Sequence, residues 1–257
     1  MSASDWRPDP AKGVFESLLV VGGEPVELEA HLARLEQSLA AVYAAQLPPQ
    51  AEEELRRAAE GINLGRVRLT IVPAEDGLRH DLLAGWVVPE TVFPVRGVKL
   101  RTQPVPGGNG PHKWVDRRGM EHPDDGAGQL ICDGDELLEA GWANLFAVRE
   151  ETLWTPPADV RILPGTARSA LLEIAAEEGM PTAERPLRAQ DLNTAEETFL
   201  TNSVRGIEPA TSLDGTDLPG CGPLSHRLAA ALRQRWRLPA EAPLASSAAP
   251  KAGQPAR

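Results

Sequence analysis

Lys113 is the residue in this sequence best placed to do covalent chemistry on a carbonyl group. The chain has only four lysines. Lys12 and Lys251 lie near the ends of the chain, which are commonly mobile, and Lys99 has the pattern of an outward position on a strand. Lys113 follows a break rich in Gly and Pro and precedes a charged amphipathic segment. Position alone favours a solvated lysine at a helix start, so the rest of the chain must decide.

A phosphate-bearing, electrophilic cofactor would need an anion site beside such a lysine. Phosphate is bound by an arginine fork and by free backbone N–H groups, which a helix N-terminus supplies. The sequence offers candidates at Arg34, at Gly165-Thr166-Ala167 and at the turn Thr201-Asn202-Ser203. A carbonyl cofactor also needs a lysine that can be neutral, which burial can arrange.

A heteroaromatic cofactor that accepts electrons needs a carboxylate against its ring nitrogen, and Glu139 is the candidate. Glu139 lies between Leu138 and Trp142, where a strand enters an uncharged run, and such surroundings raise the pKa of a carboxyl group. Each feature also has an ordinary interpretation: a loop glutamate, a helix cap at Thr166, or a plain turn at Asn202-Ser203. Their occurrence together in one chain favours a cofactor site.

The elements that must position these residues can be read from hydrophobic spacing. Leu28, Leu32, Leu35, Leu39 and Val42 recur at steps of three and four, which predicts a helix over about residues 29–46. Further helices are expected over 51–61, from Thr166 to Gly179, and over 224–235. Strands are expected over 14–21, 67–72, 84–88, 98–103, 129–133, 143–148, 153–155 and 197–201, with a polar connection over 74–81.

Composition excludes several classes of protein. A net charge of −11 argues against general binding of nucleic acids or anionic membranes, although a local basic pocket for a small anion remains possible. Cys132 and Cys221 form neither a disulfide framework nor a zinc site, so we expect no metal and a reducing, cytoplasmic location. The sequence shows no signal peptide and no apolar run long enough to span a membrane.

The strongest break, residues 104–111, suggests a division into domains. We predict a small N-terminal domain over 1–104, a linker over 105–112, a larger C-terminal domain over 113–238 and a disordered Ala/Pro-rich tail over 239–257.

Four segments, in order, resemble the class IV aminotransferase family, the fold type IV enzymes that use pyridoxal 5'-phosphate. The first two are Phe15-Glu16-Ser17 with His31-Leu32-Ala33-Arg34, and His112-Lys113-Trp114 with Asp116-Arg117. The third joins Leu138-Glu139-Ala140, Ala143-Asn144-Leu145-Phe146 and Leu163-Pro164-Gly165-Thr166-Ala167-Arg168, and the fourth is Glu197 through Ile207 with Pro209. Each motif is weak alone, but four in register over about residues 14–215 are specific.

The resemblance implies an α/β (α+β) fold of two domains, with the site between them, in a homodimer that acts on a small amino substrate. It implies that Lys113 carries the cofactor covalently and then moves protons, and that Glu139 pairs with the pyridine nitrogen. Arg34, the N–H groups of Thr166 and Ala167, and the turn at Asn202 and Ser203 would hold the phosphate. Val204, Arg205 and Arg117 would face the substrate.

Within this family the chain is most similar to aminodeoxychorismate lyases, which implies conversion of 4-amino-4-deoxychorismate to 4-aminobenzoate and pyruvate in folate synthesis. The turn Thr201 to Gly206 favours them, and Arg118 stands where the aminotransferases carry a tyrosine. The alternatives are an aminotransferase of branched-chain or D-amino acids and a non-catalytic relative that binds a partner. The segment that precedes Phe15 in the family is shortened here, which leaves the substrate open.

Overall fold

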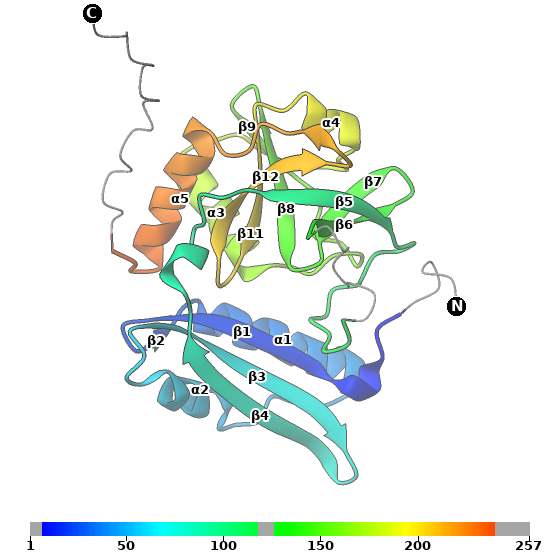
Figure 1. The fold of residues 1–257 in the computed structure, drawn as a ribbon. Helices are drawn as coiled ribbons and strands as arrows, with labels where there is room; N and C mark the ends of the chain where they lie inside the picture. The colour runs from blue at the N-terminus through cyan, green and yellow to red at the C-terminus, as the bar shows by residue number, and fades with distance from the viewer. Residues whose placement is uncertain (1–6, 118–125, 240–257) are drawn as a thin grey trace, which may run out of the picture.

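Two β-sheets, one above the other in Figure 1, form the body of the protein. The computed structural model describes residues 7–117 and 126–239. The expected tail over 239–257 therefore lies outside the described residues except for Pro239. Within the described residues, no helix is long and apolar enough to cross a membrane.

The smaller sheet is antiparallel and carries two helices on one face. Its strands, in spatial order, are β2 (Glu24–Pro25), β1 (Val14–Val21), β3 (Leu64–Ala74) and β4 (Gly77–Trp86), and the helices are α1 (Leu28–Tyr43) and α2 (Ala51–Ala59). Alternate residues of β3, namely Val67, Leu69 and Ile71, are buried in one apolar cluster with the leucines of α1 and α2. This period of two leaves the other face of β3 to its polar residues.

The larger sheet closes on itself. Its order is β10 (Thr182–Glu184), β9 (Thr152–Thr155), β8 (Ala143–Arg149), β11 (Glu197–Asn202), β12 (Gly206–Leu213), β5 (Val98–Pro104), β6 (Gly128–Asp133) and β7 (Glu136–Ala140), with β13 (Thr216–Asp217) beside β12. An additional pairing of β7 with β8 closes the run from β8 to β7 into a barrel. Leu130, Leu145 and Leu200 belong to one buried cluster of this barrel.

Helices α3 (Thr166–Glu177) and α5 (Pro223–Arg235) pack together on the barrel, and α4 (Ala189–Asn193) is a short helix near β9. The apolar faces of α3 and α5 share a core with Phe146 and Phe199, whose rings are stacked with centroids 5.3 Å apart. Short 3-10 turns occur at Pro10–Lys12 and Pro89–Thr91.

The predicted mixed fold and most predicted elements are confirmed, with several differences. The polar connection expected over 74–81 is wrong, because β3 and β4 form one long hairpin that turns at Glu75 and Asp76. Polar residues continue a strand there because one face of the hairpin is open to solvent. Strands β7, β10 and β12 were not predicted, and β5, grouped by sequence with residues 1–104, pairs with β6 and β12 in the barrel.

The segment that carries Lys113 is joined to the small sheet. The backbone N–H of Phe15 donates to the carbonyl oxygen of Lys113 at 2.9 Å, and the N–H of Val115 donates to that of Gly13 at 3.0 Å. Val14 and Trp114 form an isolated antiparallel bridge. Lys113 is therefore held on β1 at the level where the two sheets meet.

Candidate active site

Lys113 lines a pocket between the small sheet and the barrel. The pocket is also lined by Arg34, Asn109, His112, Trp114, Arg117, Glu139, Trp142, Asn144, Gly165, Thr166, Ala167, Thr201, Asn202 and Ser203, among others. Burial, the nearby charge of Arg34 and that of Arg117 lower the pKa of Lys113 to about 7, against the opposing effects of Glu16 and Glu139. At neutral pH a substantial fraction of this amine is therefore unprotonated and nucleophilic.

Glu139 is a buried carboxyl group on β7. It accepts hydrogen bonds from the backbone N–H of Leu163 at 3.2 and 3.3 Å, and a long one from Nδ2 of Asn144 at 3.4 Å. Burial raises the pKa of Glu139 to about 8, although the hydrogen bond from Leu163 and the neighbouring cations oppose the shift. A carboxyl group in this state gains strongly from a cation placed against it.

A buried ion group lies behind the pocket and involves Glu16, which the sequence analysis did not single out. Glu16 accepts hydrogen bonds from Nε and Nη2 of Arg34 at 2.8 and 2.7 Å and from Nδ1 of His31 at 2.7 Å. Burial acts to raise the pKa of Glu16, but the charge of Arg34 and the hydrogen bonds from His31 and Arg34 hold it well below its usual range. The signal for Glu16 was a carboxylate inside an apolar strand, which needs a buried partner.

This ion group fixes the start of α3. Nη1 of Arg34 donates to the carbonyl oxygen of Pro164 at 2.8 Å, and the Thr166 hydroxyl lies 3.1 Å from Nε2 of His31. Burial lowers the pKa of His31, so its neutral ring donates from Nδ1 to Glu16 and accepts from Thr166 at Nε2. The first turn of α3 has no side-chain cap, which leaves N–H groups at its start for an anion.

Gly165 permits this arrangement by its small size rather than by its backbone angle, since its φ of −67° suits any residue. A Cβ atom at position 165 would lie 1.9 Å from Oδ1 of Asn144. The side chain of Asn144 is fixed in turn by donating to the carbonyl oxygen of Leu163 at 3.0 Å.

The turn after β11 closes the pocket on the opposite side. Oδ1 of Asn202 accepts from the N–H groups of Val204 at 2.8 Å and Arg205 at 3.1 Å, which stabilises the turn. The hydroxyl of Ser203 donates to the carbonyl oxygen of Ser17 on β1 at 3.0 Å, and so connects the two sheets. The hydroxyl of Thr201, also in the pocket wall, is buried and has no hydrogen-bond partner among the described residues.

The arginines assigned to the substrate are placed differently from one another. Arg117 lines the pocket and donates from Nη1 to the carbonyl oxygen of Gly141 at 2.5 Å. Arg205 forms an ion pair with buried Glu208, and neither Arg205 nor Val204 lines the pocket.

Two further pocket residues escaped the sequence analysis. Asn109 is buried in the break before Lys113, and both polar atoms of its amide lack a partner among the described residues. Trp142 sits in the β7–β8 turn, where its indole N–H donates to Glu208 at 3.3 Å. The sequence of the Gly-rich loop does not indicate which way the side chain of Asn109 points. Trp142 was interpreted only as part of the apolar surroundings of Glu139.

Comparison with known proteins gives matches within one family. The family model for class IV amino-transferases matches residues 13–85 and 119–213. The crystal structure of 4-amino-4-deoxychorismate lyase from Pseudomonas aeruginosa is 29% identical, covers 89% of this chain and 93% of that chain, and has a TM-score of 0.75.

Two other matches are to proteins named as aminotransferases. A hypothetical aminotransferase from Mycobacterium tuberculosis, in its PLP-bound form, is 23% identical with a TM-score of 0.77, covers 88% of this chain and 89% of that chain, and supports the fold alone. The D-alanine aminotransferase of Listeria monocytogenes is 25% identical over 250 residues, 84% of this chain and 84% of that protein.

Proposed function

This chain belongs to the class IV aminotransferase family, whose members are pyridoxal-phosphate enzymes, and within that family we propose that it is a lyase that converts 4-amino-4-deoxychorismate to 4-aminobenzoate and pyruvate. The observation that carries this choice is the 29% identity to the P. aeruginosa lyase across nearly the full length of both chains. The chain's single tyrosine supports it further: Tyr43 donates to the carbonyl oxygen of Pro10 and does not line the pocket. Arg118, where the aminotransferases have a tyrosine, lies outside the described residues.

The residues around the pocket fit pyridoxal phosphate. Lys113 would hold it covalently and Glu139 would pair with its ring nitrogen, while its phosphate would be held by Arg34, Asn202, Ser203 and the N–H groups of Thr166 and Ala167. The fit rests on the uncapped start of α3, the clearance left by Gly165 and the unpartnered hydroxyl of Thr201. When bound, this cofactor supplies a carbonyl carbon for amines and a ring that accepts developing negative charge.

Lys113 has the properties that proton transfer in this reaction requires. Its Nζ, with a pKa near 7, can remove a proton from the amine-bearing carbon of the substrate at neutral pH. It can then return that proton to a different atom of the substrate. Loss of the enolpyruvyl group as pyruvate then gives an aromatic product. Glu139, once ionised against a cationic ring nitrogen, would stabilise the charge that this proton removal generates.

The proposal includes a homodimer in the cytoplasm. Large apolar side chains are exposed at and after the edge strand β4, with 65% exposure for Leu83, 71% for Trp86 and 61% for Val88. Such residues are buried more often than exposed, which suits a second subunit. Both cysteines are free thiols, as expected for a reducing compartment.

Two measurements test the proposed function. Purified protein should be yellow, and borohydride should remove the colour and attach the reduced cofactor to Lys113, located by peptide mass spectrometry. Incubation with 4-amino-4-deoxychorismate should release pyruvate in the wild type and not in Lys113→Ala. Colourless protein that cannot be reconstituted would exclude a pyridoxal-phosphate enzyme of either kind.

A D-amino-acid aminotransferase is the second candidate, because the Listeria D-alanine aminotransferase matches across 84% of both chains. It shares the cofactor site and differs in the fate of the amino group. Transfer of an amino group from D-alanine to a 2-oxo acid, without pyruvate release from 4-amino-4-deoxychorismate, would select this candidate over the lyase.

A further inference from the structure

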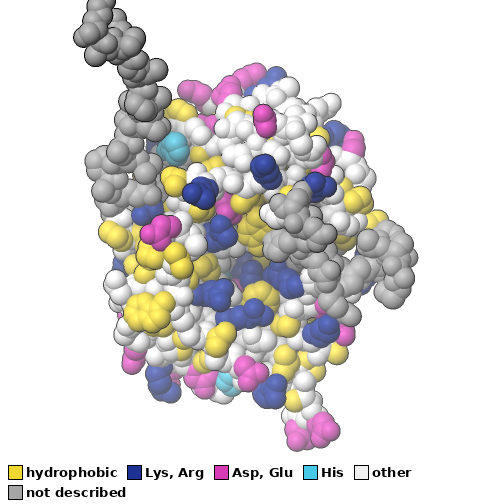
Figure 2. All heavy atoms as spheres, viewed as in Figure 1, with side chains coloured by type: hydrophobic (Ala, Val, Ile, Leu, Met, Phe, Trp, Pro, Cys, Tyr) yellow, Lys and Arg dark blue, Asp and Glu magenta, His cyan; other side chains and the backbone are white. Residues whose placement is uncertain are grey.

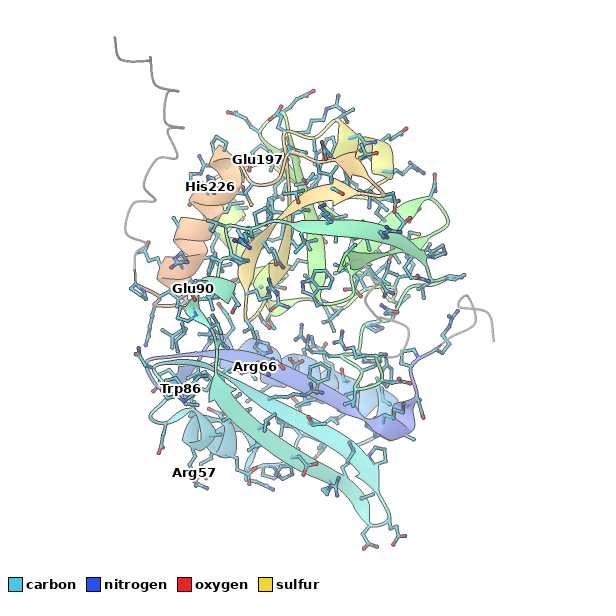
Figure 3. All side chains as sticks on the ribbon, in the orientation of Figure 1. Arg57, Arg66, Trp86, Glu90, Glu197 and His226 are labelled. Atoms are coloured by element: carbon cyan, nitrogen blue, oxygen red, sulfur yellow. The ribbon has the colours of Figure 1, made fainter. Side chains whose placement is uncertain are left out.

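The face of the small sheet opposite its helices carries arginines on β3. Because Val67 and Leu69 are buried against α1 and α2, the neighbouring Arg66 and Arg68 point to the other face. Arg68 pairs in register with Ser17 of β1, whose carbonyl oxygen accepts the hydrogen bond from Ser203. Figure 3 labels Arg66 on the small sheet, near the side that faces the barrel.

The ring of Phe15 contacts one of these arginines and also lies near the reactive amine. Its ring centroid lies 3.8 Å from Cζ of Arg68, 5.1 Å from Cζ of Arg117 and 5.2 Å from Nζ of Lys113. Three cationic groups from two segments of the chain therefore surround one aromatic ring. Figure 2 shows Lys and Arg side chains gathered in the hollow between the two halves of the molecule, although the whole chain has a net charge of −11.

Arg66 and Arg68 have no carboxylate partner in the part of the chain that the structure describes. Arg68 donates from Nε to the hydroxyl of Thr70 at 3.2 Å, a neutral acceptor. Arg161, which is also partly buried, is by contrast paired with Asp159 at 2.9 Å. Burial and the like charge of Arg66 lower the pKa of Arg68, which marks a cation short of a counter-charge.

The cofactor phosphate is not the missing anion, because two of its candidate ligands, Arg34 and the start of α3, lie on the other side of β1. Phe15 and Glu16 are consecutive in this strand and face opposite ways. Glu16 faces Arg34 and the start of α3, whereas Phe15 faces Arg68. An anion at Arg68 would therefore come from the substrate.

We propose that Arg68, supported by Arg66, binds a carboxylate of the substrate remote from the reacting amine, and so selects cyclic amines that carry two carboxylates. The inference rests on the proposed function and adds to it a specificity-determining residue. 4-Amino-4-deoxychorismate has one carboxylate on its ring and another on its enolpyruvyl group. A monocarboxylic amino acid whose carboxylate faces the turn at residues 203–205 would leave Arg68 without a counter-ion.

Equilibrium binding to the holoenzyme tests the site without turnover. Benzene-1,3-dicarboxylate and benzoate would be titrated by calorimetry into wild type, Arg68→Met, Arg68→Lys and Arg79→Met. Methionine keeps an unbranched apolar side chain against Phe15 without the charge. Arg79 is a matched control, since it lies on β4, is 68% exposed and pairs with Asp81.

The wild type should prefer the dicarboxylate, and Arg68→Met should weaken its binding by about 10- to 100-fold, the usual effect of losing a charge-assisted hydrogen bond. Benzoate binding should be unchanged, Arg68→Lys should recover part of the loss, and Arg79→Met should match the wild type. Equal loss for both ligands in Arg68→Met, or no preference in the wild type, would overturn the proposal.

Steady-state kinetics separates this inference from the proposed function. In Arg68→Met, KM for 4-amino-4-deoxychorismate should rise by a similar factor with a smaller change in kcat. Pyruvate release with an unchanged KM would refute the role of Arg68 and leave the lyase intact. Loss of dicarboxylate preference in Arg68→Met, in a protein that releases no pyruvate, would support the anion site and refute the lyase.

Discussion

Lys113 and Glu139 have shifted pKa values for the same reason, since each loses solvent and neither has a full counter-charge in the pocket. The lysine is destabilised as a cation and the glutamate as an anion, which brings their pKa values to about 7 and about 8. Near neutral pH a proton can therefore reside on either group. Both groups can therefore act as an acid or a base at the same pH.

The first prediction concerns the amine of Lys113 in the apoprotein. Competitive labelling with acetic anhydride, read by peptide mass spectrometry, should reach half its maximum near the pKa of about 7, with exposed Lys99 as a reference for the reagent. Arg117→Met should move this midpoint to higher pH, because the charge of Arg117 helps to lower the pKa. A wild-type midpoint near the ordinary lysine value of about 10.4 would contradict the prediction.

The second prediction concerns Glu139→Gln, which should stabilise the apoprotein at high pH but weaken the binding of the cofactor. The pKa of Glu139 is raised from 4.5 to about 8, so the folded apoprotein holds a proton that the unfolded chain releases in that range. The stability this contributes is present below 4.5 and is lost as the pH rises to 8. Glutamine mimics the protonated form, so the variant should be the more stable apoprotein at about pH 9 and equal at about pH 4.

Thermal unfolding measures this difference, at roughly 2–4 °C for each kcal/mol in a chain of this size. With pyridoxal phosphate the effect should reverse, because glutamine cannot carry a negative charge against a ring cation. Cofactor titration should show weaker binding and a large loss of rate. An apoprotein variant less stable than wild type at about pH 9 would argue against a buried, unpaired carboxylate.

The sequence predicted Lys113, Glu139 and Arg34 as site residues because their residue types are unusual for their settings and recur in family motifs, and all three line one pocket. It did not identify Arg68 or Asn109. Arg68 lies on the polar face of a strand with period two, where exposure is the ordinary outcome, and only the position of the barrel makes that face a candidate for the proposed anion site. Asn109 depends on the path of a Gly-rich loop, which local propensity does not determine.

At the scale of elements, the start of α3 shows what helix prediction can and cannot supply. Apolar spacing located the helix and Thr166 marked its beginning, as the structure confirms. Its orientation comes from Arg34 and His31, which are far away in the sequence. Strands β7 and β12 escaped prediction because barrel strands with both faces buried lose the alternation of polar and apolar residues.

The third prediction belongs to this helix start. Gly165→Ala should weaken pyridoxal-phosphate binding by about tenfold or more, because the new Cβ would lie 1.9 Å from Oδ1 of Asn144 and must displace it. Cofactor titration and thermal unfolding measure the effect. Gly85→Ala is the matched control, since its Cβ would meet nothing within 4 Å. Unchanged affinity in Gly165→Ala would show that the phosphate is held elsewhere.

At the scale of the whole molecule, the two-part plan with a site between its parts was predicted, but the closed barrel and the place of β5 were not. Barrel closure depends on the pairing of β7 with β8 and of β5 with β12, contacts that no local pattern encodes. The expected homodimer is likewise a property of surfaces, and the exposed apolar residues of β4 are the place to test it.

The fourth prediction is that Trp86→Glu produces a monomer. Trp86, labelled in Figure 3, is 71% exposed at the end of an edge strand, where a charge would oppose burial against a second subunit. Sedimentation velocity should give twice the chain mass for wild type and the chain mass for the variant. Val160→Glu, at a residue that is 78% exposed on the barrel side, should remain dimeric. A wild-type monomer would refute the expected assembly.

The backbone hydrogen bond from Phe15 to Lys113 has a mechanical consequence. It attaches the amine to the small sheet, whereas Glu139 and Gly165 belong to the barrel and its helix. A slight rotation of one sheet against the other would separate amine from carboxylate while every strand stayed paired. The catalytic rate would then depend continuously on the angle between the two sheets. Low concentrations of urea, or pressure, would lower the rate well before spectroscopic probes recorded any loss of structure.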